Sequence, residues 1–173
     1  VSDDGRGIPV DKHKGENKSA AEVIKTQLHA GGKFDGKNYR TSGGLHGVGA
    51  SVVNALSSKL VARIRRGGKE YIQHYRRGKA QTELEEVGPA RGTGTTMTFT
   101  PDTLIFQDLQ FDTETIFQQL EVKSFLHRGM RMVYRDQVNK QAHELKHDGG
   151  LADFLSAVME RNNDRAVLDA PFY

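Results

Sequence analysis

The chain has 173 residues, 36% hydrophobic and 27% charged, which is typical of one globular domain or one domain and part of another. It has no cysteine, which excludes disulfides and thiolate metal sites and fits a cytoplasmic location. No apolar stretch approaches the roughly 20 residues that span a bilayer, so we expect no membrane partner. The net charge of +3 is compatible with nucleic acid as a partner but does not demonstrate one.

The residue patterns predict helices and strands that are segregated rather than alternating. A tight turn over 3–9 precedes a helix that starts at the capping box of Ser19 and Glu22 and ends near Ala30. After a long loop, we expect a helix over 46–57, strands over 59–66, 69–76, 81–87 and 94–100, a helix over 112–124, strands over 130–136 and 141–147, and a helix over 151–161. This order predicts an α+β fold, a two-layer sandwich of helices on a mixed, mostly antiparallel sheet.

A glycine-rich loop, Ser42-Gly43-Gly44-Leu45-His46-Gly47-Val48-Gly49, leads directly into the second helix. Backbone N–H groups at a helix start, without side chains in the way, suit a phosphate chain. The spacing is the reverse of the dinucleotide motif, and no Gly-Lys-Ser/Thr follows, so this is not a P-loop. Taken alone, the loop also fits a flexible surface segment.

The turn Asp3-Asp4-Gly5-Arg6-Gly7-Ile8-Pro9 places a carboxylate among glycines. A carboxylate can accept a hydrogen bond from the exocyclic amine of adenine, and glycines let a flat base approach the backbone. Alone, this segment is also an ordinary Asp-Gly turn. With the glycine loop and the segment Gly31-Gly32-Lys33, it indicates a nucleotide site.

Together these segments resemble the ATPase region of the B-type subunit of bacterial type IIA topoisomerases, a GHKL ATPase. The resemblance rests on residues 3–9, on Leu28-His29-Ala30-Gly31-Gly32-Lys33-Phe34, and on the glycine loop with the helix after it. It implies binding of ATP with Mg²⁺, and DNA and an A-type subunit as partners of the parent protein. It also implies dimerisation of the ATPase region when ATP binds, and strand passage driven by ATP hydrolysis.

The resemblance assigns roles by position. Asp3 would pair with the adenine amino group, supported by Thr95, and Tyr39 would contact the base. The pocket rim would hold Arg6 and Arg66. The remaining expected ATP-binding residues line the base pocket or approach the phosphates: Gly7, Ile8, Pro9, Gly32, Lys33, Gly44, Leu45, His46, Gly47, Val48 and Gly49.

In the resembled family, the catalytic glutamate and the magnesium-binding asparagine lie on a helix before the Asp3 motif. The printed sequence begins at Val1, so we expect neither residue within it. We therefore expect an N-terminally truncated piece that hydrolyses ATP poorly or not at all. Residues 1–148 would form the ATP-binding domain, and residues 149–173 would begin the transducer domain.

Alternative interpretations remain at this point. The chain could be a nucleotide-binding regulatory module without hydrolysis, a MutL-like or Hsp90-like ATPase, or a simple basic nucleic-acid binder. The basic cluster at residues 63–69 is also typical of a solvated strand edge. His143-Glu144-Leu145-Lys146-His147 fits a zinc-protease motif, but in the expected strand the two histidines would be roughly 13 Å apart, too far to share a metal.

Overall fold

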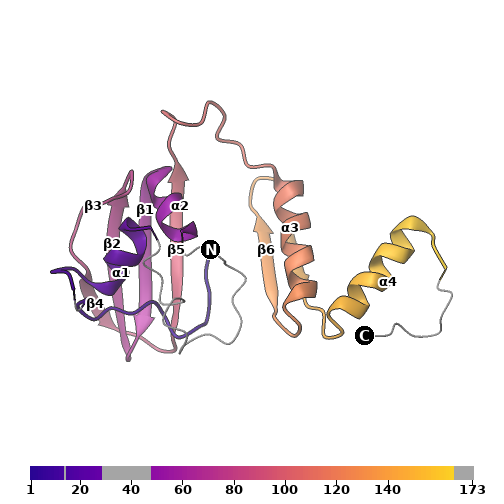
Figure 1. Cartoon of the computed structure of the whole chain (residues 1–173), viewed down its shortest axis with the longest axis horizontal. Coiled ribbons are helices and arrows are strands. Elements are labelled where there is room, and N and C mark those ends of the chain that lie inside the picture. Colours follow the sequence, from indigo (N-terminus) through magenta and orange to yellow (C-terminus); the bar gives the residue numbers. More distant parts are fainter. Residues whose placement is uncertain (14, 29–47, 166–173) are drawn as a thin grey trace. The chain divides into compact units, whose positions relative to one another are not determined.

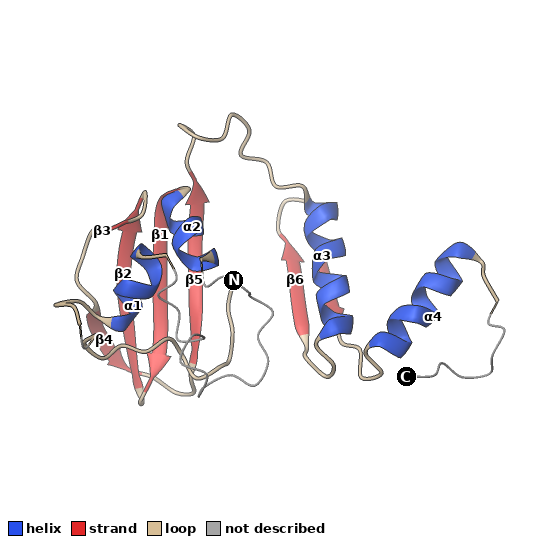
Figure 2. Ribbon diagram, in the orientation of Figure 1, coloured by secondary structure: helices blue, strands red, loops and turns tan. Residues whose placement is uncertain are grey.

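The structure is a computed structural model, and it describes residues 1–13, 15–28 and 48–165 (Figure 1). The chain divides into two compact units, Val1–Leu109 and Gln110–Tyr173. Each unit has its own sheet and its own helices (Figure 2). Within the described ranges, no helix combines the length and apolar character that crossing a bilayer requires.

The first unit contains a five-stranded sheet in the order β3-β2-β1-β5, with β4 also paired to β2. Every strand pairing in its described part is antiparallel. The strands are β1 (Ser57–Arg66), β2 (Lys69–Arg76), β3 (Lys79–Ala80), β4 (Glu85–Pro89) and β5 (Gly94–Pro101). Gly67 and Gly68 join β1 to β2 with φ of 62° and 78°, as a tight hairpin turn with two left-handed residues requires.

Two short helices, α1 (Ala20–Thr26) and α2 (Gly49–Ala55), contact each other and the strands of this sheet (Figure 2). The core consists of Leu60, Ala62 and Tyr75, each at most 1% exposed, with Val53 of α2 and Met97 of β5 packed against it. The predicted α+β class, with helices on a mostly antiparallel sheet, is confirmed.

The second unit contains α3 (Thr113–Leu126), the hairpin β6 (Met132–Asp136) with β7 (Gln141–Leu145), and α4 (Leu151–Asn162). Phe125 of α3 lies between His147, at a ring distance of 3.6 Å, and Phe154 of α4, at 5.3 Å. The structural division between Leu109 and Gln110 differs from the expected family boundary at 148–149. That boundary, at which residues 149–173 would begin a transducer domain, stays a prediction.

Two predicted helix boundaries are wrong. The first helix ends at Thr26 rather than near Ala30, because Gln27 is extended, and Leu28 is 62% exposed instead of lying on the buried face. The second helix ends at Ala55, because Ser57 already pairs with Pro101 as the first residue of β1. The predicted strand over 81–87 is confirmed only over residues 85–87, which belong to β4, while residues 81–84 lie between β3 and β4.

Candidate functional site

The Asp3 carboxylate is held by backbone N–H groups from two parts of the chain. Oδ1 accepts from the N–H of Gly5 at 2.9 Å and from the N–H of Thr95 at 3.2 Å, and the Asp3 N–H donates to the carbonyl of Thr95 at 2.9 Å. Both bonds to the carboxylate end on Oδ1, and no described residue donates to Oδ2. One oxygen therefore fixes the side chain while the other can accept a hydrogen bond from a ligand.

Two glycines allow the turn after Asp3 to lie against the sheet. Gly7 has φ of 74°, and a Cβ there would lie 2.5 Å from the carbonyl oxygen of Arg65. Gly94, at the start of β5, has φ of 142°, and a Cβ there would lie 2.1 Å from the carbonyl oxygen of Asp3. A side chain at either position would separate the turn from the strands that hold it.

Thr95 and Arg66 bind the same turn from the sheet. The hydroxyl of Thr95 accepts from the N–H of Ile8 at 3.2 Å. Nη1 of Arg66 donates to the carbonyl of Gly7 at 2.7 Å and to that of Arg6 at 3.3 Å. The structure thus brings these expected site residues into one cluster with Asp3, while Pro9 is exposed at the end of the turn.

Lys25 is a residue of this region that the sequence patterns did not single out. Its side chain is 1% exposed, and its Nζ lies 2.8 Å from the thioether Sδ of Met97. Burial lowers the pKa of Lys25 to about 8, while the Asp3 carboxylate acts in the opposite direction. A usable signal was the helix period, because Lys25 follows the buried Ala21 by four residues on α1.

Asn54 joins α2 to α1 beneath the same site. Its side-chain amide donates to the carbonyl of Lys25 at 2.9 Å, and Asn54 is fully buried. This bond fixes the end of α1 relative to the helix that follows the glycine loop.

The expected phosphate-binding residues are described only in part. Val48 precedes α2, and Gly49 is the first residue of that helix. The other expected phosphate-side residues lie outside the described residues: Gly32, Lys33, Gly44, Leu45, His46 and Gly47. Tyr39, which is expected to contact the base, also lies outside them. The described part of the site therefore holds the residues expected to bind the base, apart from Tyr39.

The remaining sequence motifs do not join this cluster. His143 lies on β7, as expected for a strand, against the ring of Phe117 at 4.6 Å. His147 instead pairs through Nδ1 with the hydroxyl of Ser124 at 2.8 Å. In the part of the chain that the structure describes, no three His, Asp or Glu side chains group as a metal site.

The basic cluster belongs to the β1–β2 hairpin. Arg63 pairs with Glu70 at 3.6 Å, and Lys69 pairs with Glu86 of β4 at 2.8 Å. These partly exposed ion pairs agree with the interpretation of the cluster as a solvated strand region.

Comparison with known proteins gives consistent matches. Residues 1–105 match the family model described as histidine kinase-, DNA gyrase B-, and HSP90-like ATPase. The chain is 47% identical over 155 residues to the DNA gyrase B protein of Thermotoga maritima, covering 90% of this chain and 24% of that protein. It is 43% identical over 176 residues to the DNA gyrase B protein of Streptococcus pneumoniae, covering 100% of this chain and 27% of that protein.

A solved structure matches almost the whole chain. It is the 43K ATPase domain of Thermus thermophilus gyrase B in complex with an aminocoumarin. The match has a TM-score of 0.83 and 37% identity, and it covers 99% of this chain and 42% of that chain. The chain spans about a quarter of the length of the two gyrase B proteins from Thermotoga and Streptococcus.

Proposed function

The chain belongs to the family of histidine kinase-, DNA gyrase B- and HSP90-like ATPases, and on that basis we propose that it is the ATP-binding region of a type IIA DNA topoisomerase. One observation carries the proposal, namely the Asp3 carboxylate fixed through Oδ1 by the N–H groups of Gly5 and Thr95. Its other oxygen, Oδ2, accepts from the exocyclic amine of adenine. Base recognition of this kind selects adenine, because guanine carries a carbonyl at the same ring position.

The other residues act around this contact. Gly7, Ile8 and Pro9 lie along the base, Arg6 and Arg66 form the rim, and Tyr39 contacts the base. On the phosphate side, Gly32 and Lys33 approach the phosphates, and the backbone of residues 44–49 wraps them. We propose that Mg²⁺ binds together with the phosphates of the nucleotide.

We propose further that the parent protein couples ATP hydrolysis to DNA strand passage. Its ATPase region dimerises when ATP binds, and it works with DNA and an A-type subunit in the cytoplasm. General-base catalysis needs a carboxylate within reach of the attacking water. None of the residues assigned to the site above is given this role, so the function proposed for the chain itself is ATP binding.

To test this proposal, titration calorimetry would measure the ATP affinity of the unmodified chain and of Asp3→Asn. The asparagine carbonyl can replace Oδ1, but its amide then opposes the adenine amine as a second donor. Loss of a charge-assisted hydrogen bond predicts affinity lower by about tenfold to a hundredfold. Asp4→Asn, which changes an exposed neighbouring acid, is the matched control and should bind ATP as the unmodified chain does.

Equal affinity of Asp3→Asn and the unmodified chain for ATP would refute this function. A turnover assay separates the remaining alternative, a regulatory module without hydrolysis. The parent protein should hydrolyse ATP, whereas a regulatory module would bind ATP without turnover.

A further inference from the structure

Lys25 is a buried cation that the proposed function leaves without a role. The Lys25 side chain is 1% exposed, and among the described residues its ammonium contacts the Sδ of Met97, at 2.8 Å. A thioether is a weak hydrogen-bond acceptor. Because a buried ammonium is costly unless it is paired, this position calls for a nearby negative charge.

The strand β5 places Lys25 close to the base-binding carboxylate. Thr95 and Met97 are two residues apart on β5, so their side chains lie on the same face, about 6.6 to 6.8 Å apart along the strand. Thr95 holds the Asp3 carboxylate through its N–H, and Met97 contacts the Lys25 ammonium. The Lys25 ammonium and the base-binding carboxylate therefore contact positions two residues apart on one strand.

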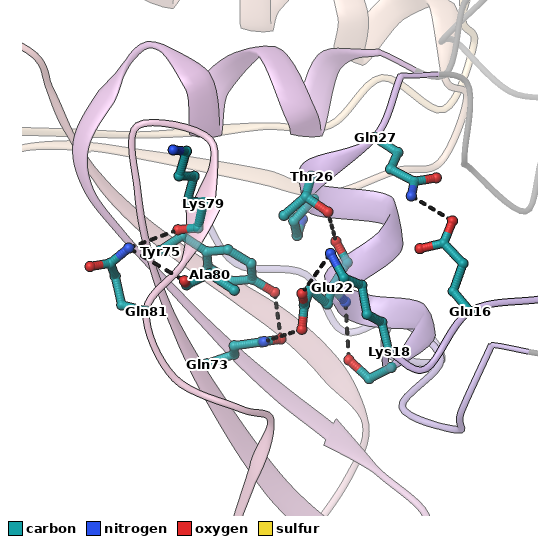
Figure 3. Close-up of polar contacts among 12 residues, drawn as sticks. Glu16, Lys18, Glu22, Thr26, Gln27, Gln73, Tyr75, Lys79, Ala80 and Gln81 are labelled. Carbon is teal, nitrogen blue, oxygen red and sulfur yellow. Dashed lines mark hydrogen bonds and ion pairs between the residues drawn. The ribbon is translucent and has the colours of Figure 1, made fainter.

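The other described groups around Lys25 are either charged and already paired, or neutral. Glu22, one turn earlier on α1, pairs with Lys18 at 3.2 Å and accepts from Gln73 at 3.2 Å (Figure 3). The contact from α2 comes from Asn54, which is neutral and binds the backbone of Lys25. Among the described groups, the Asp3 carboxylate is the charge that acts on Lys25, and it favours the ammonium form.

We infer that Lys25 is a positioning residue for base recognition, because its ammonium is the counter-charge for the Asp3 carboxylate once a purine base covers that carboxylate. The inference rests on the proposed function. Asp3 is exposed, so water stabilises its charge. A bound base removes that water and strengthens the attraction between the carboxylate and the ammonium.

This coupling makes nucleotide affinity depend on pH. Since the bound base favours the charged form of Lys25, it raises the pKa of Lys25 above its value of about 8 in the free protein. ATP affinity is then highest where Lys25 is charged in both states, and it falls as the pH rises past 8. A rise of about one pKa unit on binding corresponds to an affinity loss of about tenfold at most.

The test is ATP affinity of the full chain between pH 7 and 9.5, for the unmodified protein and for Lys25→Met. Methionine keeps an unbranched side chain of similar length and removes the charge. We expect the unmodified protein to lose about five- to tenfold in affinity over this range. Lys25→Met should bind about five- to tenfold more weakly at pH 7 and show no further loss above it.

Lys59→Met is the matched control, because Lys59 is an exposed lysine of β1. It should keep both the affinity and the pH profile of the unmodified chain. Lys25→Arg carries its charge at every pH tested, and it should bind like the unmodified chain at pH 7 without the loss above pH 8. Circular dichroism checks that each variant is folded. If a variant unfolds, the pH dependence of ATP affinity in the unmodified chain still tests the inference.

Two results would overturn the inference alone. One is ATP binding by the unmodified chain that does not change between pH 7 and 9.5. The other is a folded Lys25→Met variant that keeps the pH profile of the unmodified chain, as a purely structural role would give. By contrast, no ATP binding by the unmodified chain at any pH would refute the proposed function itself.

Discussion

At the scale of single residues, Gly94 marks the closest approach between β5 and the Asp3 turn. In Gly94→Ala, the new Cβ would lie 2.1 Å from the Asp3 carbonyl oxygen at φ of 142°, so the turn must move away. We expect the unfolding free energy to fall by about 1 to 3 kcal/mol. We also expect weaker ATP binding, because Asp3 loses its register with Thr95. Urea unfolding and calorimetry measure the two effects.

Gly15→Ala is the control for this prediction. A Cβ at Gly15 would make an ordinary contact of 3.8 Å with the ring of His13. We expect its unfolding free energy to change by less than about 0.5 kcal/mol. Equal unfolding free energies of the two variants would mean that the Asp3 turn can move away from a Cβ at residue 94 without loss of stability.

A second residue-scale prediction concerns Asp102, a 1% exposed carboxylate after β5. The Arg77 guanidinium and the N–H of Leu104 bind this carboxylate and hold its pKa below the usual range. The charged form therefore stabilises the fold above the unfolded pKa of about 3.9, and this contribution is lost as the pH falls through the lower, folded pKa. Asp102→Asn should give a shallower loss of stability on acidification.

Urea unfolding between pH 2 and 6 tests this dependence on Asp102. Asp102→Asn should be less stable than the unmodified chain at pH 6, and the difference should shrink toward pH 2. Asp4→Asn is the control and should follow the curve of the unmodified chain. A difference between Asp102→Asn and the unmodified chain that stays constant with pH would contradict the assignment.

At the scale of elements, the N-terminus of α1 matters because this seven-residue helix carries Lys25. The Ser19 hydroxyl accepts from the N–H of Glu22 at 3.1 Å, which confirms half of the predicted capping box. The Glu22 carboxylate instead binds Lys18 and Gln73. A short helix gains little from propagation, so its cap carries a large share of its stability.

Ser19→Ala should therefore lower the unfolding free energy by about 1 kcal/mol. Chemical denaturation measures the change. Ser156→Ala is the control, since Ser156 is an exposed residue inside α4 whose hydroxyl donates to the carbonyl of Ala152. That control should change the unfolding free energy by less than about 0.5 kcal/mol. Equal effects of the two substitutions would show that the Ser19 cap adds nothing.

The strands β1, β2 and β5 were easier to predict than the helix ends. The alternation of Thr95, Met97 and Phe99 and the pair Gly67-Gly68 specify β5 and the β1–β2 turn locally. The end of α1 depends on contacts that are distant in sequence, such as Asn54 binding Lys25. Local sequence patterns contain no information about such contacts, so the predicted helix extends too far, to Ala30.

The sequence predicts those residues of the candidate site whose own functional groups would contact the ligand. Asp3 and Thr95 were named in advance by resemblance, and the structure brings them together through backbone bonds. Lys25 was missed because a lysine is normally exposed, so a helical pattern of apolar residues passes over it. Its burial follows from packing against β5, which only the folded chain reveals.

At the scale of the whole molecule, the chain has two compact units, each with its own buried residues. Leu60→Ala removes a fully buried side chain of the first unit, and we expect a loss of about 2 to 5 kcal/mol there. Because the units are built from separate cores, amide protection of α3 in the second unit should be retained. Native-state hydrogen exchange measures protection in both units.

Phe125→Ala is the reciprocal variant, since Phe125 is buried in the second unit against Phe154 and His147. It should lower the protection of α3 and β6 and leave that of β1 unchanged. An equal loss of protection across both units in either variant would mean that the chain unfolds as one cooperative body.

The bonds between Asp3 and Thr95 also determine when the base-binding site can form during protein synthesis. Asp3 leaves the ribosome 92 positions before its partner. At about 5 to 20 residues per second, the delay between them is roughly 5 to 18 s. During that interval the Asp3 turn has neither the N–H nor the strand that orients its carboxylate. A nascent chain of this protein therefore cannot recognise its base until β5 has been synthesised and paired with β1.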